Sequence, residues 1–401
     1  MSVGVSHRWA YVWLPGQLAQ ISAASAATAS RPALPASVDR NERSAEGTPD
    51  RPPAGVAYDR SPRPREVLVR VAMRGFCQGA RRPRVASMTT TTALVVTAPD
   101  EMGVQQIDVA APAADETQVE VAAVGVNFID VYQRQGVYPV ETPFVLCSEG
   151  AGTSSSGERV AWPQHLGSGA GVVNVPTDKV VPVPDGVELE TAAAVMLQGL
   201  TAHYLVTSTF PVKDGDVALV HAAAGGVGQL LVQLITARGG RVIATAGTAE
   251  KRAKVEALGA EKVIDYSDPD VDLAAAVREA TGGRGVDVVY DGVGKATFDA
   301  SLASLRPRGM LVLFGGASGQ VPPFDLQRLN SAGSLFVTRP TLKDYLQDRE
   351  ELLWRADEVL GAVADGSLTV EIGGRYPLAE AAKAYSDLEG RRTTGKLLLI
   401  P

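Results

Sequence analysis

The sequence has few cysteines, few aromatic residues and no long apolar run. Its 401 residues include two cysteines, Cys77 and Cys147, which is too few for a disulfide framework or a cysteine-rich metal site. Aromatic residues make up 5% of the chain, which disfavours surfaces that stack single-stranded nucleic acid. No uninterrupted apolar run approaches the roughly 20 residues that span a bilayer. These deficits favour a protein of reducing, cytoplasmic surroundings, without a membrane partner and with nucleic acid unlikely as a ligand.

Charge is distributed unevenly along the chain. Residues 1–87 contain 13 Arg, no Lys and six acidic residues, whereas residues 88–401 carry a net charge of −14 within a total of −7. The first segment is rich in Pro, Ser, Ala and Arg without periodicity, which is typical of a disordered leader or of a start codon assigned too far upstream. A transit peptide is the alternative, and its missing amphipathic pattern disfavours it. The acidic remainder disfavours nucleic-acid binding through a basic face.

Two patterns follow one another after Met88. Up to about Gly199, short strand-like runs such as ALVV, QVEVAAVGV, GERVAWP and KVVPVP are separated by Pro, Gly and Asp turns. From about Asp216 to Arg339, β-branched runs such as VALVH, RVIATA and VDVVYD alternate with helical stretches such as AEKRAKVEALGA. Alternation of this kind predicts an α/β fold with a parallel sheet that helices cover on both faces.

The stretch HAAAGGVG, which begins at His221, joins a predicted strand to a predicted helix. Residues 223–228 match the dinucleotide fingerprint G-x-G-x-x-G, with Ala223 in place of the first glycine. Gly225 lets a pyrophosphate approach the backbone at a helix N-terminus, and Gly228 allows the helix to pack closely on the strand. The alternative is a tight turn that binds no ligand. The position of HAAAGGVG in the first strand–helix unit of the alternating pattern favours a dinucleotide site over that alternative.

The end of the next strand favours NADPH over NADH. A site for NADH usually ends this strand in Asp or Glu, which binds the ribose 2′-hydroxyl. Here RVIATA runs into Gly247, which leaves room for a 2′-phosphate. Thr248 and Lys251 can contact that phosphate with a hydroxyl and a positive charge. As the alternative, Lys251 is an ordinary solvated charge on the following helix.

Several longer motifs lie along residues 88–401: VGVNFIDVYQRQGVYP, HAAAGGVG, GTAEK, YDGVG, FGGASG, SLFVTRP and RRTTGKLLLIP. Together they resemble the zinc-independent NADPH:quinone oxidoreductases, including zeta-crystallin-like proteins, of the medium-chain dehydrogenase/reductase superfamily. The resemblance implies a GroES-like β-rich catalytic domain from residues 88–209 and 341–401. Between these segments it implies a Rossmann doubly wound nucleotide-binding domain from residues 210–340. It also implies a homodimer formed through the nucleotide-binding domains, where an exposed strand edge needs cover.

The residues at the places of zinc ligands predict that this chain holds no metal. The zinc enzymes of the superfamily have a Cys in the stretch that corresponds to VGVNFID, where this chain has Asn127. They have a second ligand in a Gly-His-Glu, which here reads Cys147-Ser148-Glu149, and Ser148 cannot replace the imidazole. The histidines elsewhere lack the spacing of a metal site.

Without a metal, the resemblance implies hydride transfer from NADPH to a quinone, which is electron-poor and becomes aromatic on accepting two electrons. Asn127, Tyr132 and Tyr138 are implied to line the substrate cleft, where either tyrosine could hydrogen-bond the reacting carbonyl. Packing of half-buried aromatics is the alternative for the tyrosines. The residues implied to contact NADPH are Phe128, Ile129, Asp130, Val131, Tyr204, Gly225, Gly226, Val227, Gly228, Gly247, Thr248, Lys251, Tyr266, Phe314, Ala317, Val337, Thr338, Arg339 and Arg391.

Two other functions are compatible with the same motifs. One is the NADPH-dependent reduction of other activated double bonds, in enones or enoyl thioesters, and the other is a non-catalytic NADPH-binding role. The chain also departs from the family between Gly152 and Gly157, where only the residues TSSS intervene. About one strand-length is missing there, so we expect a shortened β domain.

Overall fold

The computed structural model describes residues 88–401, and the leader predicted for residues 1–87 lies outside this range. The first strands of the described chain form a small antiparallel sheet in the order β2-β1-β4. Its strands are β1 (Met88–Ala98), β2 (Glu101–Ala110) and β4 (Phe144–Val145). The run ALVV lies in the buried part of β1, as its apolar composition predicts.

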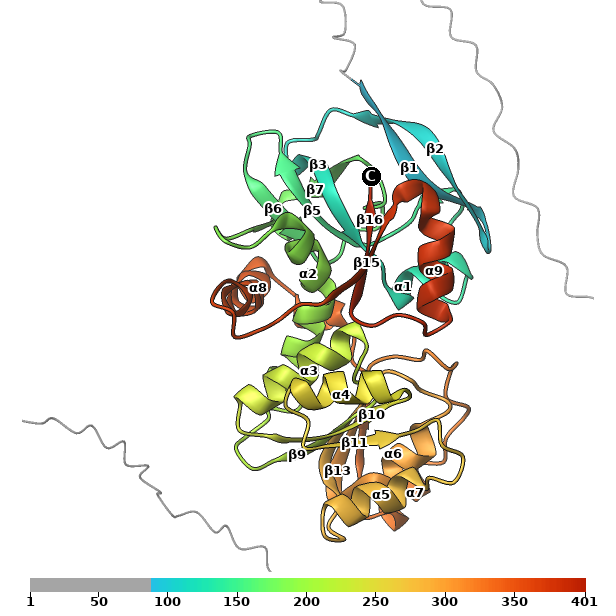
Figure 1. The fold of residues 1–401 in the computed structure, drawn as a ribbon. Helices are drawn as coiled ribbons and strands as arrows, with labels where there is room; N and C mark the ends of the chain where they lie inside the picture. The colour runs from blue at the N-terminus through green and yellow to red at the C-terminus, as the bar shows by residue number, and fades with distance from the viewer. Residues whose placement is uncertain (1–87) are drawn as a thin grey trace, which may run out of the picture. The chain divides into compact units, whose positions relative to one another are not determined.

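A second sheet brings together the two ends of the described chain (Figure 1). Six of its seven strands lie in the order β15-β16-β3-β5-β6-β8, and β7 pairs with β3 beside this path. The last strand, β16, pairs antiparallel with β3. The strands are β3 (Glu116–Gly125), β5 (Glu149–Ser154), β6 (Arg159–Trp162), β7 (Val172–Pro176), β8 (Val181–Pro182), β15 (Ile372–Pro377) and β16 (Lys396–Ile400).

The shortened segment between Gly152 and Gly157 forms the turn of a β-hairpin. The backbone amide of Ser154 donates to the carbonyl of Glu158 at 2.8 Å. Gly157 has φ +87°, a left-handed conformation that suits a residue without Cβ. Because β5 and β6 pair directly on either side of this turn, the sheet stays continuous despite the short sequence.

A third sheet has six parallel strands in the order β11-β10-β9-β12-β13-β14. The first of these strands in the sequence, β9, lies inside the sheet, and the strand order reverses there. This is the order of a doubly wound dinucleotide-binding sheet. The strands are β9 (Val217–Val220), β10 (Arg241–Ala246), β11 (Lys262–Asp265), β12 (Val286–Asp291), β13 (Leu305–Leu313) and β14 (Phe336–Thr338).

Helices cover both faces of the parallel sheet. Successive strand residues point to opposite faces, so Ala218 and Val220 pack in one core with Leu231, while Leu219 packs in the other with Val277. The predicted α/β fold, with antiparallel sheets and a Rossmann-type parallel sheet, is confirmed. The domain boundaries at residues 209 and 340 stay a prediction. The helices of this part are α3 (Gly226–Ala237), α4 (Ala249–Ala257), α5 (Leu273–Ala280), α6 (Phe298–Ser304) and α7 (Gln327–Ser331).

Two segments connect the antiparallel sheets to the parallel sheet. The outgoing segment is α2 (Leu189–Tyr204), which continues as the π-helix η2 (Leu205–Thr209). The returning segment contains the 3₁₀ turn η3 (Leu342–Tyr345) and α8 (Arg349–Ala364). The remaining elements are α1 (Phe128–Arg134), η1 (Thr177–Lys179), η4 (Leu378–Glu380) and α9 (Ala381–Glu389). Among the described helices, none is long and apolar enough to cross a membrane.

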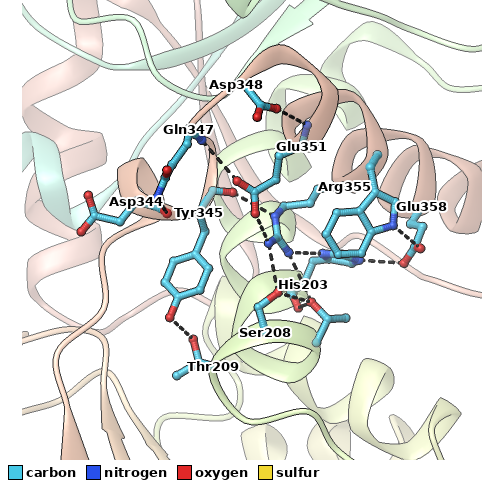
Figure 2. Close-up of polar contacts among 12 residues, drawn as sticks. His203, Ser208, Thr209, Asp344, Tyr345, Gln347, Asp348, Glu351, Arg355 and Glu358 are labelled. Atoms are coloured by element: carbon cyan, nitrogen blue, oxygen red, sulfur yellow. Dashed lines mark hydrogen bonds and ion pairs between the residues drawn. The ribbon is translucent and has the colours of Figure 1, made fainter.

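Arg355 on α8 ties these two connecting segments together (Figure 2). Its side chain is 1% exposed, and its guanidinium donates to the carbonyl of Tyr345 at 2.9 Å and to the hydroxyl of Ser208 at 3.0 Å. A further contact joins it to Nδ1 of His203 at 3.2 Å, and Glu351 neutralises its charge. One buried cation thus joins the outgoing helix to the returning one.

Candidate active site

Most of the residues predicted to bind the cofactor follow the carboxyl ends of the parallel strands. The turn at residues 222–226 follows β9, Gly247 follows β10 and Tyr266 follows β11. On the other side of β9, Phe314 follows β13 and Arg339 follows β14. The strand order reverses at β9, and this is the edge at which doubly wound sheets bind their ligands.

Two glycines at the start of α3 lie against other groups of the protein, Gly228 against backbone and Gly226 against a side chain. A Cβ on Gly228 would lie 2.6 Å from the carbonyl oxygen of Ala222, and a Cβ on Gly226 would lie 1.8 Å from Oε1 of Gln198. Gly225 is the N-cap residue of α3, and no side chain caps this helix end. The free amides of the first turn of α3 therefore favour an anion, as the fingerprint predicts.

The residues predicted at the 2′-phosphate come together at the start of α4. The hydroxyl of Thr248 caps the helix by accepting from the backbone amide of Lys251 at 3.2 Å. The ammonium of Lys251 donates to the backbone carbonyl of Arg391 at 2.8 Å, so Lys251 lies against the backbone of the second predicted cation. A Cβ on Gly247 would lie 3.3 Å from the hydroxyl of Tyr266, which places this exposed ring over the end of β10.

Tyr132 links α1 to the loop that follows β13. Its hydroxyl accepts a hydrogen bond from the backbone amide of Gly316 at 3.2 Å, and its ring meets the edge of Tyr138 at a centroid distance of 5.3 Å. Burial raises the pKa of Tyr132 above its ordinary value of 10.0. The hydroxyl therefore keeps its proton at neutral pH and can donate it to a ligand oxygen.

Asn127 lies in a buried network whose partners occupy its whole side-chain amide. Its Oδ1 accepts from Nζ of Lys396 at 2.6 Å and from Nε2 of Gln198 at 3.3 Å. Its Nδ2 donates to Oε1 of Glu149 at 2.6 Å and to the carbonyl of Gly125 at 3.3 Å. The side chain is 4% exposed, so a contact between Asn127 and a substrate requires this network to open.

Asp130 anchors the start of α1. Its Oδ2 accepts from the backbone amide of Asn127 at 2.8 Å and from the hydroxyl of Tyr385 at 3.1 Å. Burial raises its pKa from 3.8 to about 7. Three of the side chains that the resemblance assigns to the cofactor are buried within the protein: Asp130, Val131 and Tyr204. Tyr204 stacks on Tyr345 at 4.2 Å instead.

Known proteins match this arrangement over most of the described chain. Residues 226–350 match the pattern of the zinc-binding dehydrogenases. A quinone oxidoreductase of Pseudomonas aeruginosa is 42% identical over 315 residues, which cover 76% of this chain and 96% of that protein. The chain belongs to the quinone oxidoreductases of the zinc-binding dehydrogenase family. The solved structure of Escherichia coli quinone oxidoreductase complexed with NADPH matches this fold with a TM-score of 0.75 at 40% identity, over 77% of this chain and 100% of that one.

The quinone oxidoreductase family also has relatives that act on other substrates. A 2-haloacrylate reductase of a Burkholderia species is 38% identical to this chain over 321 residues, which cover 76% of the chain and 96% of that protein. This sequence identity is close to the 42% of the quinone oxidoreductase of Pseudomonas aeruginosa. Overall identity therefore does not separate one class of substrate from the other.

The match to the zinc-binding dehydrogenases does not by itself mean that this chain binds zinc. Within residues 88–401, no three side chains of His, Cys, Asp or Glu are grouped as a metal site requires. At the place of the first zinc ligand, Asn127 is bonded to the buried ammonium of Lys396. A fixed positive charge beside an amide without a free donor atom does not fit a divalent cation. Freedom from zinc stays a prediction, which metal analysis tests.

The partners of Asn127 were not predicted from the sequence motifs. Glu149 and Lys396 form an ion pair in which both side chains are almost completely buried. The signal is present in the sequence, because Lys396 begins the apolar strand KLLLI and Glu149 begins the strand EGAGTS. A charged residue is almost never fully buried without a partner. An ion pair between Glu149 and Lys396 could therefore have been predicted from the sequence.

Proposed function

We propose that this protein oxidises NADPH and reduces a quinone in the crevice between α1 and the carboxyl ends of the parallel sheet. The observation that carries the proposal is the contact between the hydroxyl of Tyr132 and the backbone amide of Gly316. This contact brings a neutral proton donor of the β-rich part against the nucleotide-binding part. The quinone oxidoreductases at 40–42% identity support the same reaction.

The side chains and backbone of the site fit NADPH. The amides at the start of α3 would bind the pyrophosphate, and Thr248 and Lys251 would bind the 2′-phosphate. Bound there, the nicotinamide would supply a hydride to the quinone, which also takes up one proton and becomes a hydroquinone. The hydroxyl of Tyr132 donates a hydrogen bond to the quinone oxygen as negative charge develops on it. Walls that exclude water strengthen this bond.

A substrate panel tests the proposal. The full chain is assayed for NADPH oxidation with ortho- and para-quinones, and in parallel with enones and 2-haloacrylate. We expect kcat/KM for a quinone to exceed that for the other substrates by about tenfold or more. Preference for 2-haloacrylate would make the protein a reductase of activated double bonds. Tight binding of NADPH without turnover of any substrate would favour a non-catalytic role.

The predicted absence of zinc has a separate test. Turnover should survive treatment with a chelator, and stoichiometric zinc with chelator-sensitive turnover would contradict the prediction.

We also propose that two copies associate along β14, within the cytoplasm. This strand ends the order of the parallel sheet, and its residues Phe336 and Val337 are 57% and 37% exposed. Leu326, on the connection that leads to this strand, is 70% exposed. An exposed apolar strand edge favours pairing with a second copy. Sedimentation should detect a dimer at micromolar concentration, and Phe336→Glu should shift it to the monomer.

A further inference from the structure

A chain of buried hydrogen bonds lies beneath the turn that follows β9. It joins His221 after β9, Thr245 on β10, Ser301 on α6 and Asp291 at the end of β12. Nδ1 of His221 lies 3.3 Å from the hydroxyl of Thr245, and Nε2 lies 3.0 Å from the hydroxyl of Ser301. The hydroxyl of Ser301 donates to Oδ2 of Asp291 at 2.8 Å. All four side chains are at most 2% exposed.

The partners determine the direction of each hydrogen bond in this chain. The carboxylate of Asp291 accepts the proton of Ser301, so the oxygen of Ser301 accepts from Nε2–H of His221. Burial lowers the pKa of His221, which leaves the ring neutral and Nδ1 free to accept. The hydroxyl proton of Thr245 is therefore directed at Nδ1. Its oxygen then accepts from the backbone amide of Ala222 at 3.2 Å.

Thr245 consequently holds two successive amides of the turn. Its hydroxyl oxygen binds the amide of Ala222, and its carbonyl oxygen binds the amide of Ala223 at 3.0 Å. Ala222 has φ +49°, a left-handed conformation that is unfavourable for a residue with a Cβ and persists only where its surroundings impose it. The carbonyl of Ala222 in turn accepts from the amide of Gly225 at 2.9 Å. The peptides flanking Ala222 therefore orient the start of α3.

We propose that His221 and Thr245 are positioning residues for the cofactor, which hold the turn at residues 222–226 in the conformation that binds the pyrophosphate. The inference rests on the proposed NADPH-binding function and assigns part of it to two side chains at most 2% exposed. A turn held in its binding conformation loses little further freedom when the ligand binds, which increases affinity. Neither residue takes part in the transfer of hydride or proton.

The variant Thr245→Val tests this role because it keeps the shape of the side chain and removes the hydroxyl. We expect the Kd of NADPH to increase by about fivefold to tenfold, because the turn loses the hydrogen bond from the amide of Ala222. The KM of the quinone and kcat at saturating NADPH should stay near those of the wild type. Thr245→Ser should restore the affinity. Adenosine 2′-monophosphate, which lacks the pyrophosphate, should bind the wild type and Thr245→Val equally well.

Two further comparisons separate a positioning role from a general loss of stability. Thr297→Val removes hydrogen bonds to Asp291 at the far end of the chain, and should lower the melting temperature without changing the Kd of NADPH. His221→Gln, which loses the acceptor for Thr245, should weaken NADPH binding more than His221→Asn, which keeps an oxygen near the place of Nδ1. If Thr245→Val does not fold, the comparison of His221→Gln with His221→Asn still tests the positioning role.

Two sets of results would overturn the inference. One is wild-type affinity in Thr245→Val and His221→Gln. The other is an equal loss of affinity for adenosine 2′-monophosphate and NADPH in these variants, which would mark a general structural effect. In either case NADPH binding by the wild type would leave the proposed function intact. If the wild type itself does not bind NADPH, the proposed function fails and this inference fails with it.

Discussion

The ammonium of Lys251 and the backbone carbonyl of Arg391 are joined by a hydrogen bond of 2.8 Å. This bond connects the first turn of α4 to the turn that follows α9, 140 residues further along the chain. It holds the charge of Lys251 beside the end of β10, where a 2′-phosphate would lie. The ammonium can exchange this neutral carbonyl for a charged phosphate oxygen, which makes the stronger hydrogen bond.

Lys251→Ala should therefore weaken the binding of NADPH and leave that of NADH nearly unchanged. A charge-assisted hydrogen bond contributes roughly 1.5–3 kcal/mol, which corresponds to an increase in Kd of about tenfold to somewhat over a hundredfold. Titration of the variant with both cofactors measures the difference. Lys262→Ala is the control, because Lys262 lies at the amino end of β11, away from the predicted cofactor site. This variant should bind NADPH and NADH as the wild type does. An equal loss for NADPH and NADH would contradict the assignment of Lys251 to the phosphate.

Gly247→Asp should reduce the preference for NADPH further and can invert it. The new carboxylate would accept from the ribose hydroxyl of NADH and repel the 2′-phosphate of NADPH. A side chain here also meets the hydroxyl of Tyr266 at 3.3 Å, so Gly247→Ala is needed to isolate the steric effect. Because Tyr266 is exposed, its ring can move, and Gly247→Ala should keep the preference of the wild type. If both Gly247→Ala and Gly247→Asp invert the preference for NADPH, the shape of this position, and not its charge, selects the cofactor.

Tyr132→Phe should lower kcat/KM for the quinone by about a hundredfold to a thousandfold, the range expected when one donor to a developing negative charge is lost. The Kd of NADPH should change little, because the hydroxyl contacts the loop amide of Gly316 and no predicted phosphate site. Tyr138→Phe is the matched control, since its ring touches that of Tyr132 and is 38% exposed. If Tyr138→Phe lowers activity as much as Tyr132→Phe, the hydroxyl of Tyr132 is not the donor.

Asp130 should make the protein less stable as pH rises from about 4 to about 7. Its pKa is 3.8 in the ordinary case and about 7 in the folded state, where burial disfavours the charge. Between these values the unfolded chain has released the proton and the folded chain retains it. The free energy of unfolding therefore decreases with rising pH, by up to about 1.4 kcal/mol per pH unit. This contribution is fully present below the lower pKa and is lost above the higher one.

Asp130→Asn measures this contribution directly. The amide oxygen can keep the hydrogen bonds from Asn127 and Tyr385, and the group no longer titrates. Urea denaturation at several values between about pH 5 and pH 8 should show a smaller decrease in stability for the variant than for the wild type. Parallel curves for the two proteins would show that Asp130 titrates in its ordinary range.

Arg355→Met should destabilise the protein by about 2–4 kcal/mol, because it leaves the buried partners of the guanidinium without a donor. These partners include the carbonyl of Tyr345 and the hydroxyl of Ser208 (Figure 2). Arg375→Met is the control, since Arg375 forms an exposed ion pair with Glu190 and such pairs contribute about 1 kcal/mol or less. Thermal or chemical denaturation compares the two. Similar losses would show that Arg355 does not hold the connecting segments together.

The strands of the parallel sheet were predictable from local sequence. RVIATA and VDVVYD coincide with β10 and β12, because short β-branched runs that are buried on both faces form parallel strands. The helix α2 was missed for the opposite reason. Its sequence LETAAAVMLQGLTAHY is apolar around most of its circumference, and most of its residues are buried. Such a helix shows no apolar stripe for periodicity to detect.

The α/β pattern, the glycine-rich turn and the missing acid after β10 could be read from the amino-acid sequence, because each depends on residues that are close along the chain. The contacts between distant side chains depend on the folded arrangement of the elements. Asn127 and Lys396 are 269 residues apart, and a hydrogen bond of 2.6 Å joins them because β3 and β16 pair in one sheet. His221 reaches Ser301 because α6 packs on β12, the strand that lies beside β9 in the sheet. Periodicity reports which face of an element is buried, whereas the identity of the partner depends on how separate elements pack against one another.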